Sequence, residues 1–129
     1  MARFVAIGLG EWQSEGFDRP NMDLPGQQDA LVEQVAAANA RTIVVLGTCS
    51  PISMPWIEKV AAVVQAWYPG QECGNAIADV LFGDTNPCGK LPQTFPAHLE
   101  ETLLLQNSRP LRLTFASVTW FVALVRASA

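Results

Sequence analysis

Charged residues are scarce in this sequence. They make up 16% of it, against roughly 25% in a typical soluble domain, while half of the residues are hydrophobic. This balance is not that of a disordered chain. The 8 basic residues form no cluster and are outnumbered by 12 acidic ones, for a net charge of −4. The sequence thus has no cluster of Lys and Arg that could neutralise a phosphate backbone, which argues against nucleic-acid binding.

Cysteines and long apolar runs are also few. Cys49, Cys73 and Cys88 are odd in number and contain no Cys-x-x-Cys pair, which indicates neither a disulfide framework nor a metal site. Neither a Gly-x-Gly-x-x-Gly motif nor a Walker loop occurs, so no nucleotide cofactor is expected. The first ten residues are too short for a signal peptide, and residues 115–125 are too short for the ~20-residue span of a bilayer. We therefore expect a soluble protein without membrane contact, in an unidentified compartment.

The length of 129 residues suits one domain with its own core. All acidic residues lie between Glu11 and Glu101, whereas the last 27 residues hold three arginines and no acid. This break predicts a body at residues 1–102 and a distinct tail at 103–129. Leu111, Leu113 and Phe115 alternate in the tail, which is typical of a strand that could extend an exposed sheet edge or exchange between two chains of a dimer.

The body alternates strand and helix patterns. Strands are predicted at residues 3–10, 42–47 and 61–66, with an edge strand at 91–95, and a short helix at the end of 50–59. Helices are predicted at 29–39 and 72–82, the second closed by a left-handed Gly83. Their expected buried residues are Leu31, Val32, Val35, Ala36, Ile77, Val80 and Leu81. The fold class is α/β, a three-layer sandwich with a mostly parallel open sheet and helices on both faces.

The long polar loop at residues 11–26 follows the first strand. In open parallel sheets, ligands bind beyond the carboxyl ends of the strands, so this loop is the expected functional region. Several motifs in order, from this loop onward, resemble glycoside hydrolase family 3, specifically the α/β sandwich domain that follows the barrel in its β-glucosidases. The motifs are Glu11-Trp12, Ser14-Glu-Gly-Phe-Asp-Arg19, Met22-Asp-Leu-Pro25, Ser50-Pro51, Met54-Pro-Trp56, Gln65-Ala-Trp-Tyr-Pro-Gly-Gln71, Gly74-Asn-Ala-Ile-Ala-Asp-Val-Leu-Phe-Gly83 and Gly89-Lys-Leu-Pro-Gln-Thr-Phe-Pro96.

The resemblance implies retaining hydrolysis of β-glucosides by two carboxyl groups about 5–5.5 Å apart. The nucleophilic aspartate belongs to the barrel, and motif matching makes Glu15 the acid/base residue, with Glu11 as its main rival. Phe17 or Trp12 would lower the local dielectric and raise the carboxyl pKa, as a general acid requires.

Other residues of this loop are predicted to bind the substrate or to position the loop. Trp12 and Glu11 are predicted to contact the substrate, a β-glucoside or glucose. Gly16, Asp18 and Arg19 are predicted to position the loop, the last two by pairing with each other or with the barrel. Elsewhere, three aromatic residues are predicted in the core or at an interface: Trp56, Trp67 and Tyr68. His98 is predicted at the surface.

The sequence also departs from the family. The barrel is absent, so the chain alone is expected to be inactive or weak until a barrel is supplied, and the resemblance covers residues 3–101 only. A change of reading frame or a foreign junction would explain the tail. Two alternatives stay open: a glucoside-binding module without catalysis, and an unrelated hydrolase such as an esterase that uses Ser50 or Cys49 with His98 as base.

Overall fold

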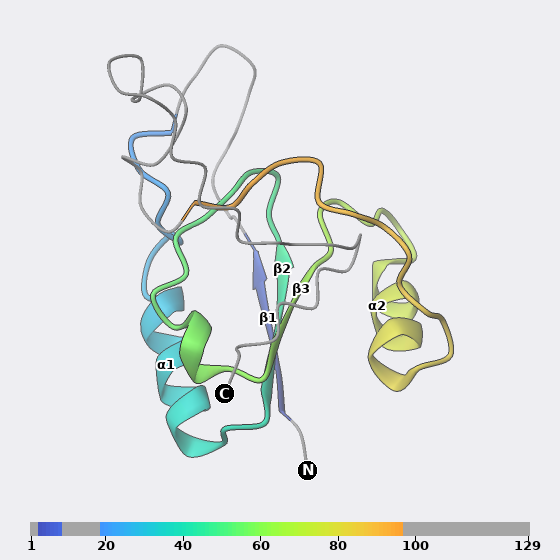
Figure 1. The fold of residues 1–129 in the computed structure, drawn as a ribbon, viewed down its shortest axis with the longest axis horizontal. Helices are drawn as coiled ribbons and strands as arrows, with labels where there is room; N and C mark the ends of the chain where they lie inside the picture. Colours follow the sequence, from blue (N-terminus) through green and yellow to red (C-terminus); the bar gives the residue numbers. More distant parts are fainter. Residues whose placement is uncertain (1–2, 9–18, 97–129) are drawn as a thin grey trace.

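A computed structural model describes residues 3–8 and 19–96. Three parallel strands form one sheet in the order β1-β2-β3: β1 (Arg3–Gly8), β2 (Thr42–Gly47) and β3 (Ala62–Gln65). Arg3 pairs with Thr42 and Gly8 with Gly47, and Ile43 pairs with Ala62. Helix α1 (Gln28–Ala38) connects β1 to β2, and a 3-10 turn, η1 (Ile57–Lys59), precedes β3. Figure 1 shows α1 and α2 (Cys73–Phe82) on opposite sides of this sheet. The predicted α/β class with a parallel sheet is confirmed.

The central strand forms because its residues are apolar on both faces. Val44, Val45 and Leu46 are all at most 4% exposed, which is typical of a strand covered on both sides in a parallel sheet. Its bounds match the prediction, and β3 lies within the predicted 61–66.

Helix α1 buries a narrower stripe than predicted. Val32 and Ala36 are buried, but Leu31 is 49% exposed and Val35 is only half-buried. Val32 and Ala36 are four residues apart and share one line along the helix. Leu31 and Val35 form the preceding line, about 100° around the axis, so they lie at the border of the contact. The prediction that all four are buried is wrong for Leu31 and Val35.

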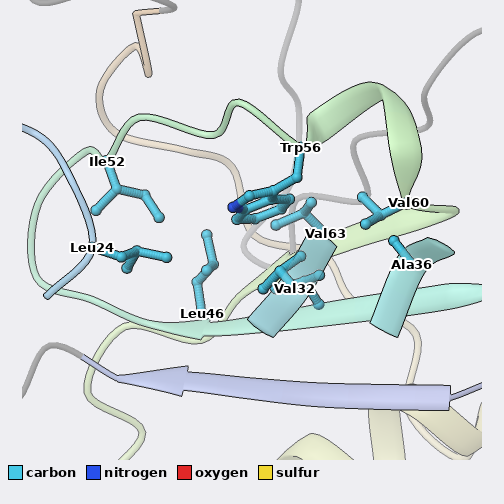
Figure 2. Close-up of a cluster of buried hydrophobic side chains, with 9 residues drawn as sticks. Leu24, Val32, Ala36, Leu46, Ile52, Trp56, Val60 and Val63 are labelled. Carbon is cyan, nitrogen blue, oxygen red and sulfur yellow. The ribbon is translucent and has the colours of Figure 1, made fainter. Parts of the chain in front are cut away.

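One core cluster lies between α1, the segment after β2, and one face of the sheet (Figure 2). Trp56, the largest fully buried side chain, lies among aliphatic residues. Met54, Ile57 and Phe95 pack against the cluster. Its members come from five segments, namely the loop before α1, α1, β2, the β2–β3 connection and β3: Leu24, Val32, Ala36, Val44, Leu46, Ile52, Trp56, Val60 and Val63. The sequence predicts Trp56 in the core or at an interface, and the structure places it in the core.

Helix α2 forms as predicted but is not buried. Gly83 ends it in the left-handed conformation, at φ 89°, and its N–H donates to the Asp79 carbonyl. Ile77, Val80 and Leu81, however, are only half-buried, and the neighbouring Phe82 is 76% exposed. The expectation of a buried stripe on α2 is therefore wrong. An apolar stripe determines which side of a helix would be buried, but burial also needs a partner element at that side.

The predicted edge strand at residues 91–95 is also not formed; the described chain has no strand after β3. Pro92 lacks an N–H that could join a ladder, and the segment instead brings Phe95 against the core cluster. Tyr68, predicted in the core or at an interface, is 72% exposed in this chain. Among residues 19–96, no helix is long and apolar enough to cross a membrane. The tail at 103–129 and His98 lie outside the described residues.

Candidate functional site

The end of the long loop is held at the carboxyl end of β2 by Arg19. One guanidinium nitrogen of Arg19 donates to the Asp23 carbonyl at 2.6 Å. The other donates to the Ser50 hydroxyl and the Pro51 carbonyl, both at 3.4 Å. Arginine is suited to this task because its planar guanidinium presents several N–H donors in a rigid fork. The side chain thus joins residues 19–23 to the segment that leaves β2.

Backbone hydrogen bonds and burial also hold together this junction between residues 19–23 and the segment that leaves β2. The Ser53 N–H donates to the Met22 carbonyl at 2.7 Å, and the Asp23 N–H donates to the Asn21 side-chain oxygen at 3.2 Å, which makes a local turn. Met22 and Leu24 are 8% and 4% exposed. Two motifs that are far apart in the sequence, around Met22 and around Ser50, therefore lie side by side.

A buried polar network lies under this junction. Gln65, the last residue of β3, is 2% exposed, and Thr48, directly after β2, is fully buried. The Gln65 amide nitrogen donates to the Thr48 carbonyl at 2.7 Å and lies 3.2 Å from the Thr48 hydroxyl. The Thr48 hydroxyl lies within donor distance of the Ser50 carbonyl, at 3.2 Å, and of the Gln65 side-chain oxygen, at 3.4 Å. Buried polar groups need such partners, because an unpaired one costs about 1–3 kcal/mol.

Beside the network, the exits of β2 and β3 bring Cys49 and Tyr68 together. The Cys49 thiol lies 4.0 Å from the Ser50 hydroxyl. A hydrogen bond with the Cys49 side chain, followed by desolvation and the thiolate charge, raises the pKa of Tyr68 above its usual value. Trp67 takes a left-handed φ of 53° as the chain leaves β3. Its ring meets that of Phe95 edge-on, with centroids 6.2 Å apart.

Most of the predicted site residues lie outside the described part of the chain: Glu11, Trp12, Glu15, Gly16 and Asp18. Arg19 lies inside it, and its described partners are Ser50, Pro51 and Asp23. Ser50, the esterase candidate, accepts a hydrogen bond from Arg19, and its proposed base His98 is outside the described residues. Within residues 3–8 and 19–96, no group of three or more His, Cys, Asp or Glu side chains could hold a metal ion.

Sequence reasoning did not single out Thr48, and it named Gln65 only as the start of a motif. A signal was present, since Gln65 stands inside the otherwise apolar run at residues 61–66. A polar residue at a buried strand position implies a hydrogen-bond partner. The sequence alone does not identify that partner, Thr48, which directly follows the neighbouring strand.

Comparisons with known sequences agree with the motif resemblance. A β-glucosidase of Rhizobium radiobacter is 61% identical over 92 residues, which are 71% of this chain and 11% of that protein. The probable β-glucosidase J of one Aspergillus fumigatus strain is 54% identical over 98 residues, 75% of this chain and again 11% of the relative. The chain thus spans about a tenth of the length of these relatives.

Solved structures match the fold as well. A β-glucosidase from Kluyveromyces marxianus, solved in complex with glucose, is 48% identical with a TM-score of 0.76, over 81% of this chain and 13% of that one. A β-glucosidase from Streptomyces venezuelae, solved with D-glucose, is 52% identical with a TM-score of 0.67, over 73% and 12% of the two chains. The glycosyl hydrolase family 3 C-terminal domain matches residues 2–120. The chain belongs to this family.

Proposed function

We propose that this chain is part of a β-glucosidase and contributes its acid/base residue, Glu15. The proposal rests on family membership and on the names of the relatives. The structural observation that supports it most is the junction around Arg19, which ties the end of the long loop to the carboxyl end of β2. This is the edge at which open parallel sheets bind ligands.

In this proposal, Glu15 acts twice in a retaining mechanism. As an acid, it protonates the departing glycosidic oxygen while an aspartate of the family's barrel domain attacks the anomeric carbon. As a base, it then takes a proton from the water that hydrolyses the glycosyl-enzyme. By resemblance, the nucleophile belongs to the family's barrel domain, so formation of that covalent intermediate needs the barrel as well as Glu15.

The remaining loop residues bind the sugar or position the loop that carries Glu15. Trp12 offers an apolar ring to a sugar face, and Glu11 accepts hydrogen bonds from sugar hydroxyls. Gly16 and Asp18 shape the loop beside Glu15, and Arg19 anchors its end. The relatives solved with glucose support a glucosyl group as the bound sugar. The barrel is the partner that the activity requires.

The test is a chimera of the Rhizobium radiobacter β-glucosidase in which the 92 matched residues are exchanged for those of this chain. Two substrates separate acid catalysis from other roles. A dinitrophenyl β-glucoside has a leaving group that departs without a proton, whereas an alkyl β-glucoside needs one. We expect Glu15→Gln to lower kcat/KM for the alkyl glucoside by about 10²- to 10⁴-fold, the size of a lost general acid, and to affect the dinitrophenyl glucoside far less.

Glu11→Gln is the matched control. If Glu11 binds the sugar, its loss raises KM to the same extent for both substrates, since uniform binding has been removed. A leaving-group-dependent loss in Glu11→Gln, with none in Glu15→Gln, would assign the acid to Glu11 and overturn the proposed role. Hydrolysis of either substrate by the unmodified chain without a barrel would overturn the need for a partner.

A further inference from the structure

We propose that Thr48 and Gln65 are positioning residues for the acid/base loop, acting through Ser50 and Arg19. This inference rests on the proposed function. Hydrogen bonds lead stepwise from the buried end of β3 to Arg19, four residues after Glu15. Neither Thr48 nor Gln65 has a part in the chemistry described above.

The first step is the contact between two strand ends. Gln65 is the last residue of β3 and Thr48 follows the last residue of β2. The Gln65 amide donates to the Thr48 carbonyl at 2.7 Å, and both side chains are at most 2% exposed. A buried hydrogen bond of this kind is costly to break, because its partners cannot turn to water instead. It therefore fixes the direction in which the chain leaves β2.

The second step passes from Thr48 to Ser50. The Thr48 hydroxyl lies 3.2 Å from the Ser50 carbonyl, which makes a tight local turn around Cys49. This turn presents the Ser50 hydroxyl and the Pro51 carbonyl to the same guanidinium nitrogen of Arg19, each at 3.4 Å.

The third step connects Arg19 to the end of the long loop, residues 19–23. Arg19 also holds the Asp23 carbonyl, and Met22 accepts a hydrogen bond from Ser53, so residues 19–23 are fixed to residues 50–53. Movement of the Ser50 segment would therefore carry Arg19 with it. Displacing a catalytic group by about 1 Å can cost roughly 10²-fold in rate, so a change at Thr48 should be measurable at the acid/base step.

Residue Thr42 provides a matched control at the opposite end of β2. It is as fully buried as Thr48, and its hydroxyl donates to the Asn39 carbonyl at 2.7 Å. Thr42→Val and Thr48→Val thus remove the same group from the two ends of one strand. In the chimera, we expect Thr48→Val to lower kcat/KM by about 10- to 100-fold for the alkyl glucoside and much less for the dinitrophenyl glucoside. Thr42→Val should leave the ratio between the two substrates unchanged.

Two further variants keep the test decisive if Thr48→Val fails to fold. Thr48→Ser retains the hydroxyl and should restore the substrate ratio. Ser50→Ala changes a half-buried residue outside the core, and should give the same leaving-group dependence through the loss of its contact with Arg19. Equal losses for both substrates, or no loss, in Thr48→Val and Ser50→Ala would overturn the inference.

A second readout needs no barrel. A glutamate-specific protease cleaves the full chain after Glu11 and Glu15, and mass spectrometry identifies the fragments. We expect faster cleavage at these two bonds in Thr48→Val than in Thr42→Val at matched unfolding free energy; equal rates would count against the inference. Glu15→Gln separates the two proposals: if it shows the leaving-group effect and the Thr48 and Ser50 variants do not, only the positioning role fails.

Discussion

The indole N–H of Trp56 donates a hydrogen bond to a carboxylate oxygen of Asp29 at 2.6 Å. Asp29 lies in the first turn of α1, and Trp56 is fully buried just before η1. The bond therefore connects the amino end of the crossover helix to the segment between β2 and β3, through a side chain of the core cluster, Trp56, which Figure 2 labels. A negative charge near a helix N-terminus is favourable in itself, so Asp29 has two stabilising interactions.

Trp56→Phe tests the worth of this bond. The ring remains apolar while the donor is lost, and hydrogen bonds to charged groups contribute about 1.5–3 kcal/mol to stability. We expect a loss of at least that size in the free energy of unfolding, measured by urea denaturation, because the smaller ring also leaves unfilled space in the core. In a double-mutant cycle with Asp29→Ala, the loss in the double variant should be smaller than the sum of the two single losses, because both changes remove the same bond. Additive losses would show that the two side chains do not interact.

Two glycines at opposite ends of α2 predict opposite effects of alanine. Gly83 has a φ of 89°, where a side chain costs about 1–2 kcal/mol, so Gly83→Ala should lower the unfolding free energy by that amount. Gly74 lies in the first turn, and a Cβ there meets nothing within 4 Å. Gly74→Ala should raise stability by about 0.5–1 kcal/mol. Urea denaturation checks both, and a loss in Gly74→Ala would contradict the description of α2.

Because of its contact with Cys49, Tyr68 should titrate with a pKa above the ordinary tyrosine value. The hydrogen bond with Cys49 raises the pKa of Tyr68, so Cys49→Ala should lower that pKa towards its ordinary value. Tyr68 is the one tyrosine in the sequence, which makes its ionisation directly visible by ultraviolet absorbance. Cys73→Ala, at an exposed cysteine of α2, is the control. Equal tyrosine titrations in the two variants would contradict the contact.

The ion pair between Glu33 and Lys59 should be worth little despite its length of 2.6 Å. Both side chains are about half exposed, at 43% and 55%, and exposed pairs contribute about 0.2–1 kcal/mol. We expect Lys59→Met to change the unfolding free energy by less than about 1 kcal/mol at low salt. The difference from the unmodified chain should shrink further in high salt because the charges are screened. A large, salt-independent loss would show that Lys59 acts through packing instead.

Local patterns were sufficient for the three strands of the sheet and for both α-helices. The β-branched run at residues 42–47 is a strand with those bounds, and the periodic segments give helices within a residue or two. These strands and helices depend mainly on residues close together in the sequence, so local patterns predict them. The motif series likewise led to the family, because motifs are sequence properties.

Contacts between segments that are far apart in the sequence could not be predicted from it, and only the tertiary structure shows them. The apolar stripe of α2 did not reveal that Ile77, Val80 and Leu81 would be only half-buried, since burial depends on a partner elsewhere. The edge-strand prediction at residues 91–95 did not reveal that Phe95 would pack against the core cluster and not join the sheet. Nor could spacing bring Arg19 to Ser50, 31 residues away, or Thr48 to Gln65, 17 residues away. The sequence by itself therefore determined the three strands, the two α-helices and the family. The tertiary structure alone decided which buried polar groups meet, because such pairing follows from strand order and register.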